Sequence, residues 1–405
     1  MNLMQTHFLS NRLNGIAGSP MLALIAKTAE LRSQGRDIIG LAAGEPDFDT
    51  PVHIQDAAVA AIRRGDTRYT APEGTLALRN AIARKFRREN QLAYSTDQII
   101  VSVGAKQVIY NAFAATLNPE DQVIIPTPSY PAYAEMVKMC AGMPVGIACD
   151  ASQGFKLRPE QLHAAITPRT KWLVLCSPSN PTGAVYTEAE LCALGEVLRD
   201  HPHVWVLTDD IYEHLLFSGN PFATIAAAAP HLYERTLVVN GVSKAYCMTG
   251  WRIGYGAGSR ELVKAMTTVQ SQSTSSPCSI SQSAAVAALD GPHDFLKAHQ
   301  AAYRERRDLV VSQLNAAEHV SCNTPDGAFY VLASCEAAIG RATPNGEVIS
   351  SDTAFVAYLL ESEGVVVVPG TAFEMPGYFR ISYAADTQTL SSACERIAKA
   401  TSRLN

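Results

Sequence analysis

The chain has 405 residues, and at about 150 residues per domain this length suggests two or three domains. Apolar residues make up 47% and charged residues 18% of the chain, which excludes an intrinsically disordered or collagen-like protein. Lys and Arg number 33 against 38 Asp and Glu, giving a formal net charge of -5. This balance gives no support for binding a polyanion, so we expect no nucleic-acid partner.

The nine cysteines form no CxxC pair, which predicts reduced thiols in a cytoplasmic protein. The N-terminal sequence MNLMQTHFLSNRLNG has neither a basic start nor an apolar stretch of signal-peptide length. No window of about 18 residues is apolar and uncharged enough to cross a bilayer. We therefore expect no membrane partner.

In chain order, the first helix pattern lies within residues 19–35, where Pro20 suits the first helical position. From about residue 50 to 290, short apolar runs alternate with amphipathic segments of helix length. Runs that are apolar at successive positions are typical of parallel strands buried on both faces. The alternation predicts a doubly wound α/β domain over residues 50–290. The predicted strands lie within 98–104, 121–126, 171–178, 203–210 and 235–244, and the helices within 106–117, 131–142 and 187–200.

The remainder of the chain has a different pattern. A long helix is predicted near residues 293–315, and it is the best candidate for the connection between domains. Short strands and two helices are expected after it. We predict a smaller α+β domain formed by residues 1–49 and 291–405. Its expected strands lie within 327–334, 364–370 and 378–384, and its helices within 351–364 and 387–404.

Polar residues follow the predicted strands at the edge where an open parallel sheet binds its ligands. Lys244 comes directly after one strand, in a loop of small residues. Burial there would lower the pKa of its amine and make the neutral form available as a nucleophile. A lysine considered alone is more often an exposed surface charge. Other strand ends carry Gly104, Ala105, Lys106, Ser129, Tyr130, Asn180, Asp209, Asp210, Tyr212 and Ser243.

The segment GVSKAYCMTGWRIG at 241–254 resembles the cofactor-lysine signature of the class I pyridoxal-phosphate-dependent aminotransferases. One position departs from it, because Cys247 stands where the family usually has Ala or another small residue. The resemblance extends over nearly the whole chain in the family's order. It implies fold type I, with a mostly parallel seven-stranded sheet covered by helices and a smaller α+β domain. The further matching segments are 41–51, 68–79, 178–183, 209–212 and 379–383.

The resemblance implies pyridoxal 5'-phosphate as the cofactor, with Lys244 as its attachment site. Asp209 would hold the ring nitrogen protonated, and Tyr212 and Asn180 would donate hydrogen bonds to the ring oxygen. Without the resemblance, Asp209 could equally be a turn residue and Asn180 part of an Asn-Pro turn. Asp210, where the family usually has Glu, is expected to be structural.

The resemblance also implies a phosphate site. Gly104, Ala105 and Lys106 lie between a predicted strand and a helix, where backbone amides can bind an anion. Arg252 would supply a cation and Ser243 a hydroxyl group. Glycine at such a turn is common for steric reasons alone. Tyr69 would reach the phosphate in a neighbouring subunit, so the resemblance implies a homodimer with shared active sites.

The remaining implied contacts concern the ring and the substrate. Tyr130 would stack on the cofactor ring. Arg380 would bind the substrate α-carboxylate through a bidentate fork, beside the backbone of Gly44 and the side chain of Asn180. Lys106 resembles a lysine that contacts the distal carboxylate in some bacterial aspartate aminotransferases. It could instead be an ordinary first-turn residue facing solvent.

The sequence thus predicts an aminotransferase that acts by ping-pong half-reactions, with aspartate and 2-oxoglutarate as the preferred pair and no metal. The expected catalytic residues are Lys244, Asp209 and Tyr212. Aromatic, alanine or prephenate-type substrates remain open, as does a C–S β-lyase on the same fold. A nicotinamide-dependent oxidoreductase is disfavoured, because no GxGxxG follows an early strand.

Overall fold

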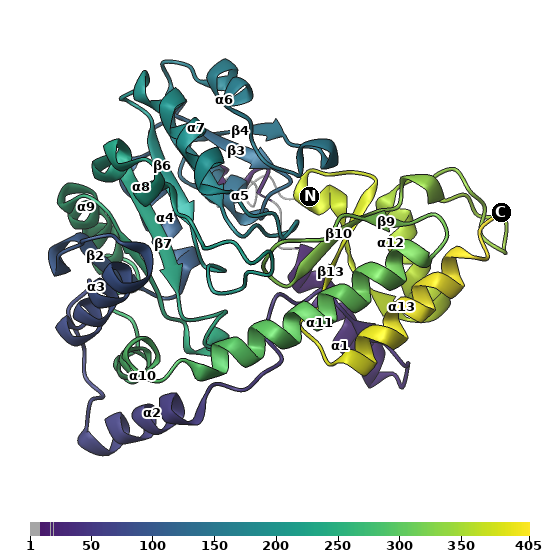
Figure 1. Cartoon of the computed structure of the whole chain (residues 1–405), viewed down its shortest axis with the longest axis horizontal. Helices are drawn as coiled ribbons and strands as arrows, with labels where there is room; N and C mark the ends of the chain where they lie inside the picture. Colours follow the sequence, from purple (N-terminus) through teal and green to yellow (C-terminus); the bar gives the residue numbers. More distant parts are fainter. Residues whose placement is uncertain (1–8, 17, 19) are drawn as a thin grey trace.

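The structure is a computed structural model that describes residues 9–16, 18 and 20–405 (Figure 1). Its largest sheet has seven strands in the order β2-β8-β7-β6-β5-β3-β4. All pairs are parallel except those of β8, which runs antiparallel to β2 and β7. The strands are β2 (Ile99–Ser102), β3 (Gln122–Thr127), β4 (Met143–Ala148), β5 (Thr170–Cys176), β6 (Trp205–Asp209), β7 (Thr236–Gly241) and β8 (Gly254–Ala257).

Helices cover both faces of this sheet because its central strands are apolar on both sides. On β5, Trp172 and Val174 pack in one core with α4, α5 and α9, whereas Leu173 and Leu175 pack in another with α6, α7 and α8. A third core joins α2, α3 and α10 to β2, β7 and β8. These helices are α2 (Val52–Arg64), α3 (Leu76–Asn90), α4 (Ala105–Thr116), α5 (Ala132–Met139), α6 (Pro159–Ala165), α7 (Glu188–Arg199), α8 (Ile225–Ala228), α9 (Arg260–Ser271) and α10 (Ser279–Asp290).

The prediction of a mostly parallel seven-stranded sheet covered by helices is confirmed. Each of the five strand ranges taken from the sequence contains or overlaps a strand, and each of the three helix ranges overlaps a helix. The apolar runs did not reveal β4 and β8. β4 is an edge strand with exposed positions, and β8 contains two glycines in its four residues, so neither has the apolar run of a central strand.

A second, four-stranded antiparallel sheet has the order β12-β13-β10-β9 and lies apart from the first (Figure 1). The helices α11, α12 and α13 cover this sheet. Helix α1 packs near β12, beside the short parallel pair formed by β1 and β11. The elements are α1 (Pro20–Ser33), β1 (Ile39–Gly40), α11 (Asp294–Ala316), β9 (Ser321–Cys322), β10 (Tyr330–Ser334), α12 (Asp352–Glu363), β11 (Val365–Val366), β12 (Val368–Pro369), β13 (Tyr378–Ser382) and α13 (Thr387–Thr401).

The long helix α11 runs from beside α10 to a position alongside α13 (Figure 1). Near its middle, Arg306 forms two bonds of 2.7 and 2.9 Å to Asp47, in the segment after β1. The pairing of β1 with β11 supports our proposal that the beginning and the end of the chain share one domain, with boundaries near residues 50 and 290. Short 3-10 helices occur at Asn11–Leu13, Thr96–Gln98, Ala151–Gln153, Pro230–Arg235, Thr249–Trp251, Glu336–Ala338 and Gly370–Phe373.

Within the part of the chain that the structure describes, no helix is both long enough and apolar enough to span a membrane.

Candidate active site

A pocket of about 390 Å³ opens where β5, β6 and β7 end, and residues of the smaller sheet close its other side. The parallel strands β2, β3, β5, β6 and β7 deliver polar residues there because parallel strands end at one edge of the sheet. β10 and β13 contribute Tyr330 and Arg380 from across the pocket. The main lining residues are Gly44, Glu45, Ala105, Lys106, Tyr130, Tyr133, Asn180, Asp209, Tyr212, Ser243, Lys244, Thr249, Arg252, Tyr330 and Arg380.

Lys244 lies in this pocket, three residues after β7. Its Nζ donates a hydrogen bond of 2.5 Å to the carbonyl oxygen of Gly44 and lies 5.9 Å from the ring centres of Tyr212 and Phe329. Burial lowers the pKa of Lys244 to about 8, against the opposing effect of Glu45. A substantial fraction of the amine is therefore neutral near physiological pH.

Asp209 ends β6 and is buried in the pocket. Its Oδ2 accepts a hydrogen bond of 2.7 Å from the hydroxyl of Tyr133, and its Oδ1 accepts one of 3.3 Å from the amide of Ile211. Burial raises the pKa of this carboxyl to about 6. Asp210 does not line the pocket and accepts a bond of 2.6 Å from Thr208. Asp210 is the first residue after β6, and its amide still bonds to β7, so the alternation of side chains continues through it and separates the two carboxyls.

Arg380 is completely buried among aromatic rings. Its Nη1 donates to Asn180 Oδ1 at 2.8 Å, and its Nη2 donates to the carbonyl of Ala42 at 2.6 Å. The guanidinium lies 4.5 Å from the ring centre of Tyr330, whose hydroxyl is 2.9 Å from that of Tyr212. Its Nε has no hydrogen-bond partner among the described residues, so the buried cation retains an unused donor.

The start of α4 lies against Arg252. Gly104 precedes the helix with a φ of +84°, and a Cβ there would lie 2.4 Å from Nη2 of Arg252. The left-handed backbone angle favours glycine here, and an added Cβ would also displace the guanidinium of Arg252. No described side chain caps α4 at Gly104. The first amides of the helix and the guanidinium together form a positive site suited to an anion.

Lys106 and Tyr130 lie at the same end of the pocket. The Nζ of Lys106 is 5.3 Å from the ring centre of Tyr130, and the lysine is exposed to solvent. Gly44 lies opposite, where a Cβ would be 2.3 Å from the hydroxyl of Tyr330. Two predicted residues do not line the pocket: Gly104, which lies against Arg252 at its edge, and Tyr69. Tyr69 is 95% exposed and lines a separate hollow between α2, α3 and α10.

Sequence reasoning missed several residues of this site. Tyr133 lies in the first turn of α5, and its ring centre is 5.6 Å from that of Tyr130, which precedes the helix. Tyr330 gave no signal, because an aromatic residue in a strand is typical of a core. Only the pairing of β10 with β13 places it beside Arg380. Glu45, which accepts a bond from Thr249, was likewise not singled out.

Residues 36–397 match the family model described as aminotransferase class I and II. The chain belongs to this family. It is 55% identical over 390 residues to an aspartate/prephenate aminotransferase of Cereibacter sphaeroides, covering 96% of this chain and 98% of the relative. A crystal structure of the aspartate aminotransferase of Rhizobium meliloti is 54% identical with a TM-score of 0.96, covering 98% and 99%. The aspartate aminotransferase of Thermus thermophilus with maleate is 44% identical with a TM-score of 0.91, covering 97% and 99%.

Membership of the aminotransferase class I and II family implies pyridoxal phosphate as the cofactor. The described residues fit such a group. The uncapped helix start with Arg252 suits a phosphate, and the buried Asp209 carboxyl has no cation within hydrogen-bonding distance among its described partners. A protonated ring nitrogen would supply one. Lys244 supplies an amine of lowered pKa for covalent attachment.

Proposed function

We propose that this chain catalyses transamination between L-aspartate and 2-oxoglutarate by a ping-pong mechanism. The observation that carries the proposal is the placement of the Lys244 amine in one pocket with the buried Asp209 carboxyl and the buried Arg380 guanidinium. An amine, an acid and a carboxylate-binding fork are the groups that proton transfer at an amino-acid α-carbon requires.

In this mechanism, bound pyridoxal phosphate supplies an electron-withdrawing ring that stabilises negative charge at the α-carbon. Asp209, which accepts a hydrogen bond from Tyr133, would hold the ring nitrogen protonated. Tyr212 and Asn180 would donate hydrogen bonds to the ring oxygen, and Tyr130 would stack on the ring. The neutral amine of Lys244 would take the proton from the substrate α-carbon as a general base and give it back as a general acid.

Arg380 would orient the substrate. Its planar guanidinium lines the pocket and favours a bidentate bond to the α-carboxylate. Because Nη1 and Nη2 are already held by Asn180 and Ala42, the fork is fixed before the substrate arrives. Such preorganisation reduces the entropy lost on binding. The backbone of Gly44 lies beside the same position.

The phosphate would bind at the start of α4. The amides of Ala105 and Lys106, the hydroxyl of Ser243 and the guanidinium of Arg252 would supply its hydrogen bonds, with Gly104 leaving room for the arginine. These donors come from separate segments of the chain. A phosphate there would therefore hold the segment after β7 against α4.

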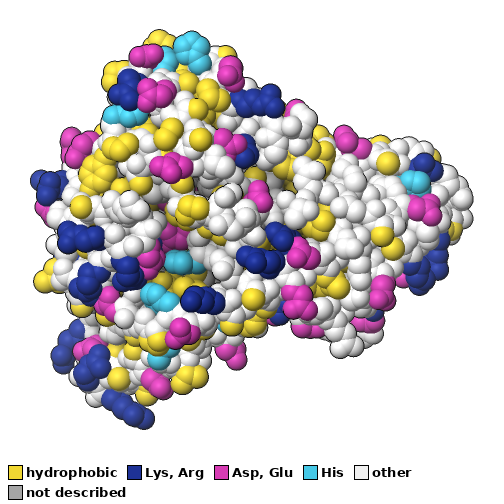
Figure 2. All heavy atoms as spheres, in the orientation of Figure 1, with side chains coloured by type: hydrophobic (Ala, Val, Ile, Leu, Met, Phe, Trp, Pro, Cys, Tyr) yellow, Lys and Arg dark blue, Asp and Glu magenta, His cyan; other side chains and the backbone are white. Residues whose placement is uncertain are grey.

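We infer a homodimer in which Tyr69 completes the site of the neighbouring copy. Tyr69 is 95% exposed here, and large apolar side chains of α2 and α3 are exposed on the same part of the molecule. Figure 2 shows Lys and Arg side chains gathered over α2 and α3. A second copy would cover the exposed apolar side chains of α2 and α3 and bring a phosphate group near Tyr69. The exposed apolar residues are Val52, Val59, Ile62 and Leu76.

The preference for dicarboxylic acids rests on Lys106. Its exposed ammonium at the pocket could bind a second carboxylate by a charge-assisted hydrogen bond. The relatives from Rhizobium meliloti and Thermus thermophilus are aspartate aminotransferases, and the latter was solved with maleate, a four-carbon dicarboxylate. The Cereibacter sphaeroides relative is an aspartate/prephenate aminotransferase, so prephenate is a second candidate acceptor for this chain.

We place the reaction in the cytoplasm. All nine cysteines are free thiols in the structure, which is typical of proteins from a reducing compartment.

Reductive trapping tests the assignment of Lys244. The protein is incubated with pyridoxal phosphate, treated with borohydride, digested and mapped by mass spectrometry. We expect the cofactor mass on the peptide that contains Lys244. Labelling of a different lysine would contradict the proposed function.

A panel of amino donors tests the substrate preference. We expect Lys106→Ala to lower kcat/KM for aspartate about tenfold or more while leaving alanine nearly unchanged, since only aspartate loses a charged contact. Arg380→Lys is expected to weaken both donors, because every amino acid uses its α-carboxylate. Single-turnover bleaching of cofactor absorbance gives the rates. Equal losses for aspartate and alanine in Lys106→Ala would remove the basis for naming aspartate.

A further inference from the structure

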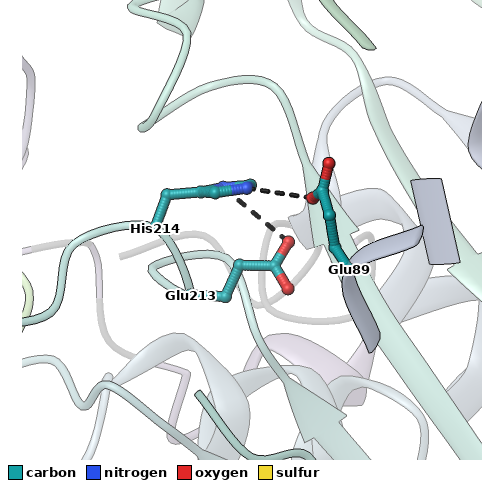
Figure 3. Close-up of side chains that lie close together, drawn as sticks. All are labelled: Glu89, Glu213 and His214. Atoms are coloured by element: carbon teal, nitrogen blue, oxygen red, sulfur yellow. Dashed lines mark hydrogen bonds and ion pairs between the residues drawn. The ribbon is translucent and has the colours of Figure 1, made fainter. Parts of the chain in front are cut away.

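A cluster of polar side chains lies buried behind the turn that carries Tyr212. Tyr212 lines the pocket, but the next residue, Glu213, does not. Figure 3 shows Glu213 together with Glu89 and His214. We call the whole group the Glu213 cluster. Its members are Lys85, Glu89, Asn90, Glu213, His214 and Asn240.

Both carboxylate oxygens of Glu213 accept hydrogen bonds from other elements. Oε2 accepts one of 2.7 Å from Asn90 Nδ2 on α3. Oε1 accepts one of 2.8 Å from Asn240 Nδ2 on β7 and another from the ammonium of Lys85. Lys85 is completely buried, and the other three side chains are at most 6% exposed. Glu213 therefore joins three segments that are far apart in the sequence.

The cluster is an ion-pair network and does not require a metal. Glu89, Glu213 and His214 could together offer ligand atoms to a cation. The Lys85 ammonium, however, contacts Glu213 and lies 3.6 Å from Oε2 of Glu89. Burial opposes ionisation of Glu213, yet Lys85 and His214 hold its pKa below the usual value. A protein cation thus already balances the carboxylates.

Stability is a weak explanation for such a network. A buried ion pair is often no more stabilising than well-packed apolar residues of similar volume, because its members lose their hydration. What it provides is directional bonding, which fixes the relative positions of the groups it joins. The relevant question is therefore which positions Glu213 fixes.

The side chain of Glu213 links the chain that follows β6 to β7, beyond the last backbone pair of these two strands. The last paired residues are Asp209 and Val239, followed by a bond of 2.9 Å from the Asp210 amide to the Val239 carbonyl. After Asp210 the chain turns away from β7. The bond between Glu213 and Asn240 spans the gap from this turn to the end of β7. Asn240 precedes Lys244 by four residues.

We propose that Glu213 is a positioning residue that, through Asn240, sets the position of Tyr212 relative to Lys244. This role rests on the proposed function, in which Tyr212 bonds to the cofactor ring and Lys244 transfers the proton. Because Tyr212 and Glu213 are adjacent, the bond that anchors Glu213 to β7 also anchors the backbone that carries Tyr212.

The test uses the holoenzyme and Asn240→Ala, which removes the bond from β7 but leaves Lys85 and Asn90 on Glu213. We expect kcat to fall about 10- to 100-fold, the range for a misplacement near the reacting atoms. KM for aspartate should change much less, because Arg380 is on another element. The pH midpoint of the bound cofactor's absorbance change should rise by about one unit, since the ring oxygen loses a donor.

The matched control is Asn90→Ala. Asn90 and Asn240 are both buried and donate nearly equal bonds to Glu213, 2.7 and 2.8 Å, but Asn90 comes from α3. We expect this variant to lose stability in urea unfolding while keeping its absorbance midpoint and a kcat within about twofold of wild type. Equal changes of kcat and midpoint in the two variants would overturn the proposal.

A second variant covers the case in which Asn240→Ala does not fold. The double substitution Lys85→Met, Glu213→Leu removes both charges and leaves the bond that the Gly241 amide donates to Asn240 Oδ1. We expect it to fold and to show the same loss of kcat and the same midpoint shift. Wild-type values in the folded double variant would overturn the positioning role. A wild-type protein that neither transaminates nor labels at Lys244 would instead contradict the proposed function.

Discussion

Asp209 and Asp210 are adjacent in the sequence, but only the side chain of Asp209 lines the pocket. Asp209 lies in the pocket with Tyr133 on its Oδ2, whereas Asp210 lies outside it with Thr208 on its Oδ1. Both are buried, and burial raises the pKa of Asp210 to about 7. Replacing Asp209 should therefore change catalysis, whereas replacing Asp210 should change stability.

We predict that Asp209→Asn lowers kcat about 100-fold or more, because a neutral amide cannot stabilise charge on the ring nitrogen. Asp210→Asn should leave kcat within a few-fold of wild type. Steady-state kinetics with aspartate and 2-oxoglutarate distinguish them. Similar losses in both variants would show that burial alone, not contact with the cofactor, makes Asp209 important.

The raised pKa of Asp210 predicts a pH-dependent stability. The unfolded carboxyl titrates near 3.8 and the folded one near 7, so its contribution is most favourable below about pH 4 and is lost as pH rises to 7. Asn does not titrate. We therefore expect the free energy of unfolding of Asp210→Asn, relative to that of wild type, to increase by about 3 kcal/mol between pH 5 and pH 8. Urea unfolding at the two pH values measures this, and a constant difference would contradict it.

At the scale of elements, the phosphate end depends on how closely β8 approaches α4. A Cβ on Gly254, the first residue of β8, would lie 2.0 Å from the amide nitrogen of Ala105. This contact is backbone against backbone, so no side-chain rotation can relieve it. β8 is also continuous with the segment that carries Arg252. The strand thus places the cation and the helix amides together.

We predict that Gly254→Ala destabilises the protein by about 1 to 3 kcal/mol, as overpacking does, and weakens pyridoxal phosphate binding about tenfold as the helix start moves. Gly250→Ala is the matched control, because a Cβ there meets no described atom within 4 Å and its φ is not in the left-handed region. Urea unfolding and fluorescence titration give the two quantities. Equal effects at the two glycines would refute the steric argument.

At the scale of the whole molecule, the proposed dimer has a testable consequence. Tyr69 lies outside the pocket of its own chain. If it completes the site of a second copy, one heterodimer can contain one intact site built from two defective chains. This outcome depends on assembly and not on the stability of either chain.

We predict that mixing Lys244→Ala with Tyr69→Ala under subunit exchange restores activity toward about a quarter of wild type. Random pairing makes half of the dimers mixed, with one wild-type site in each. Each variant alone, carried through the same exchange, is the control. Activity equal to the mean of the two separate variants would show that the sites are not shared.

The amino-acid sequence by itself determined the alternation of strands and helices and the residues at the strand ends. Both are local properties, since buried parallel strands need continuous apolar runs and each strand delivers its terminal residues to one sheet edge. Lys244, Asp209, Tyr212, Asn180, Arg252 and Arg380 were predicted in this way or from motifs, and the structure brings them into one pocket.

Only the tertiary structure decided which residues support them. Tyr330 meets Arg380 through the pairing of β10 with β13, and Glu213 meets Asn240 across the gap beyond β6 and β7. β4 and β8 also lacked the apolar run of a central strand. These contacts join residues tens of positions apart in the sequence, and a linear pattern does not specify which of them will meet. The chemistry of the site could be predicted because it lies at strand ends, whereas its positioning depends on packing between elements.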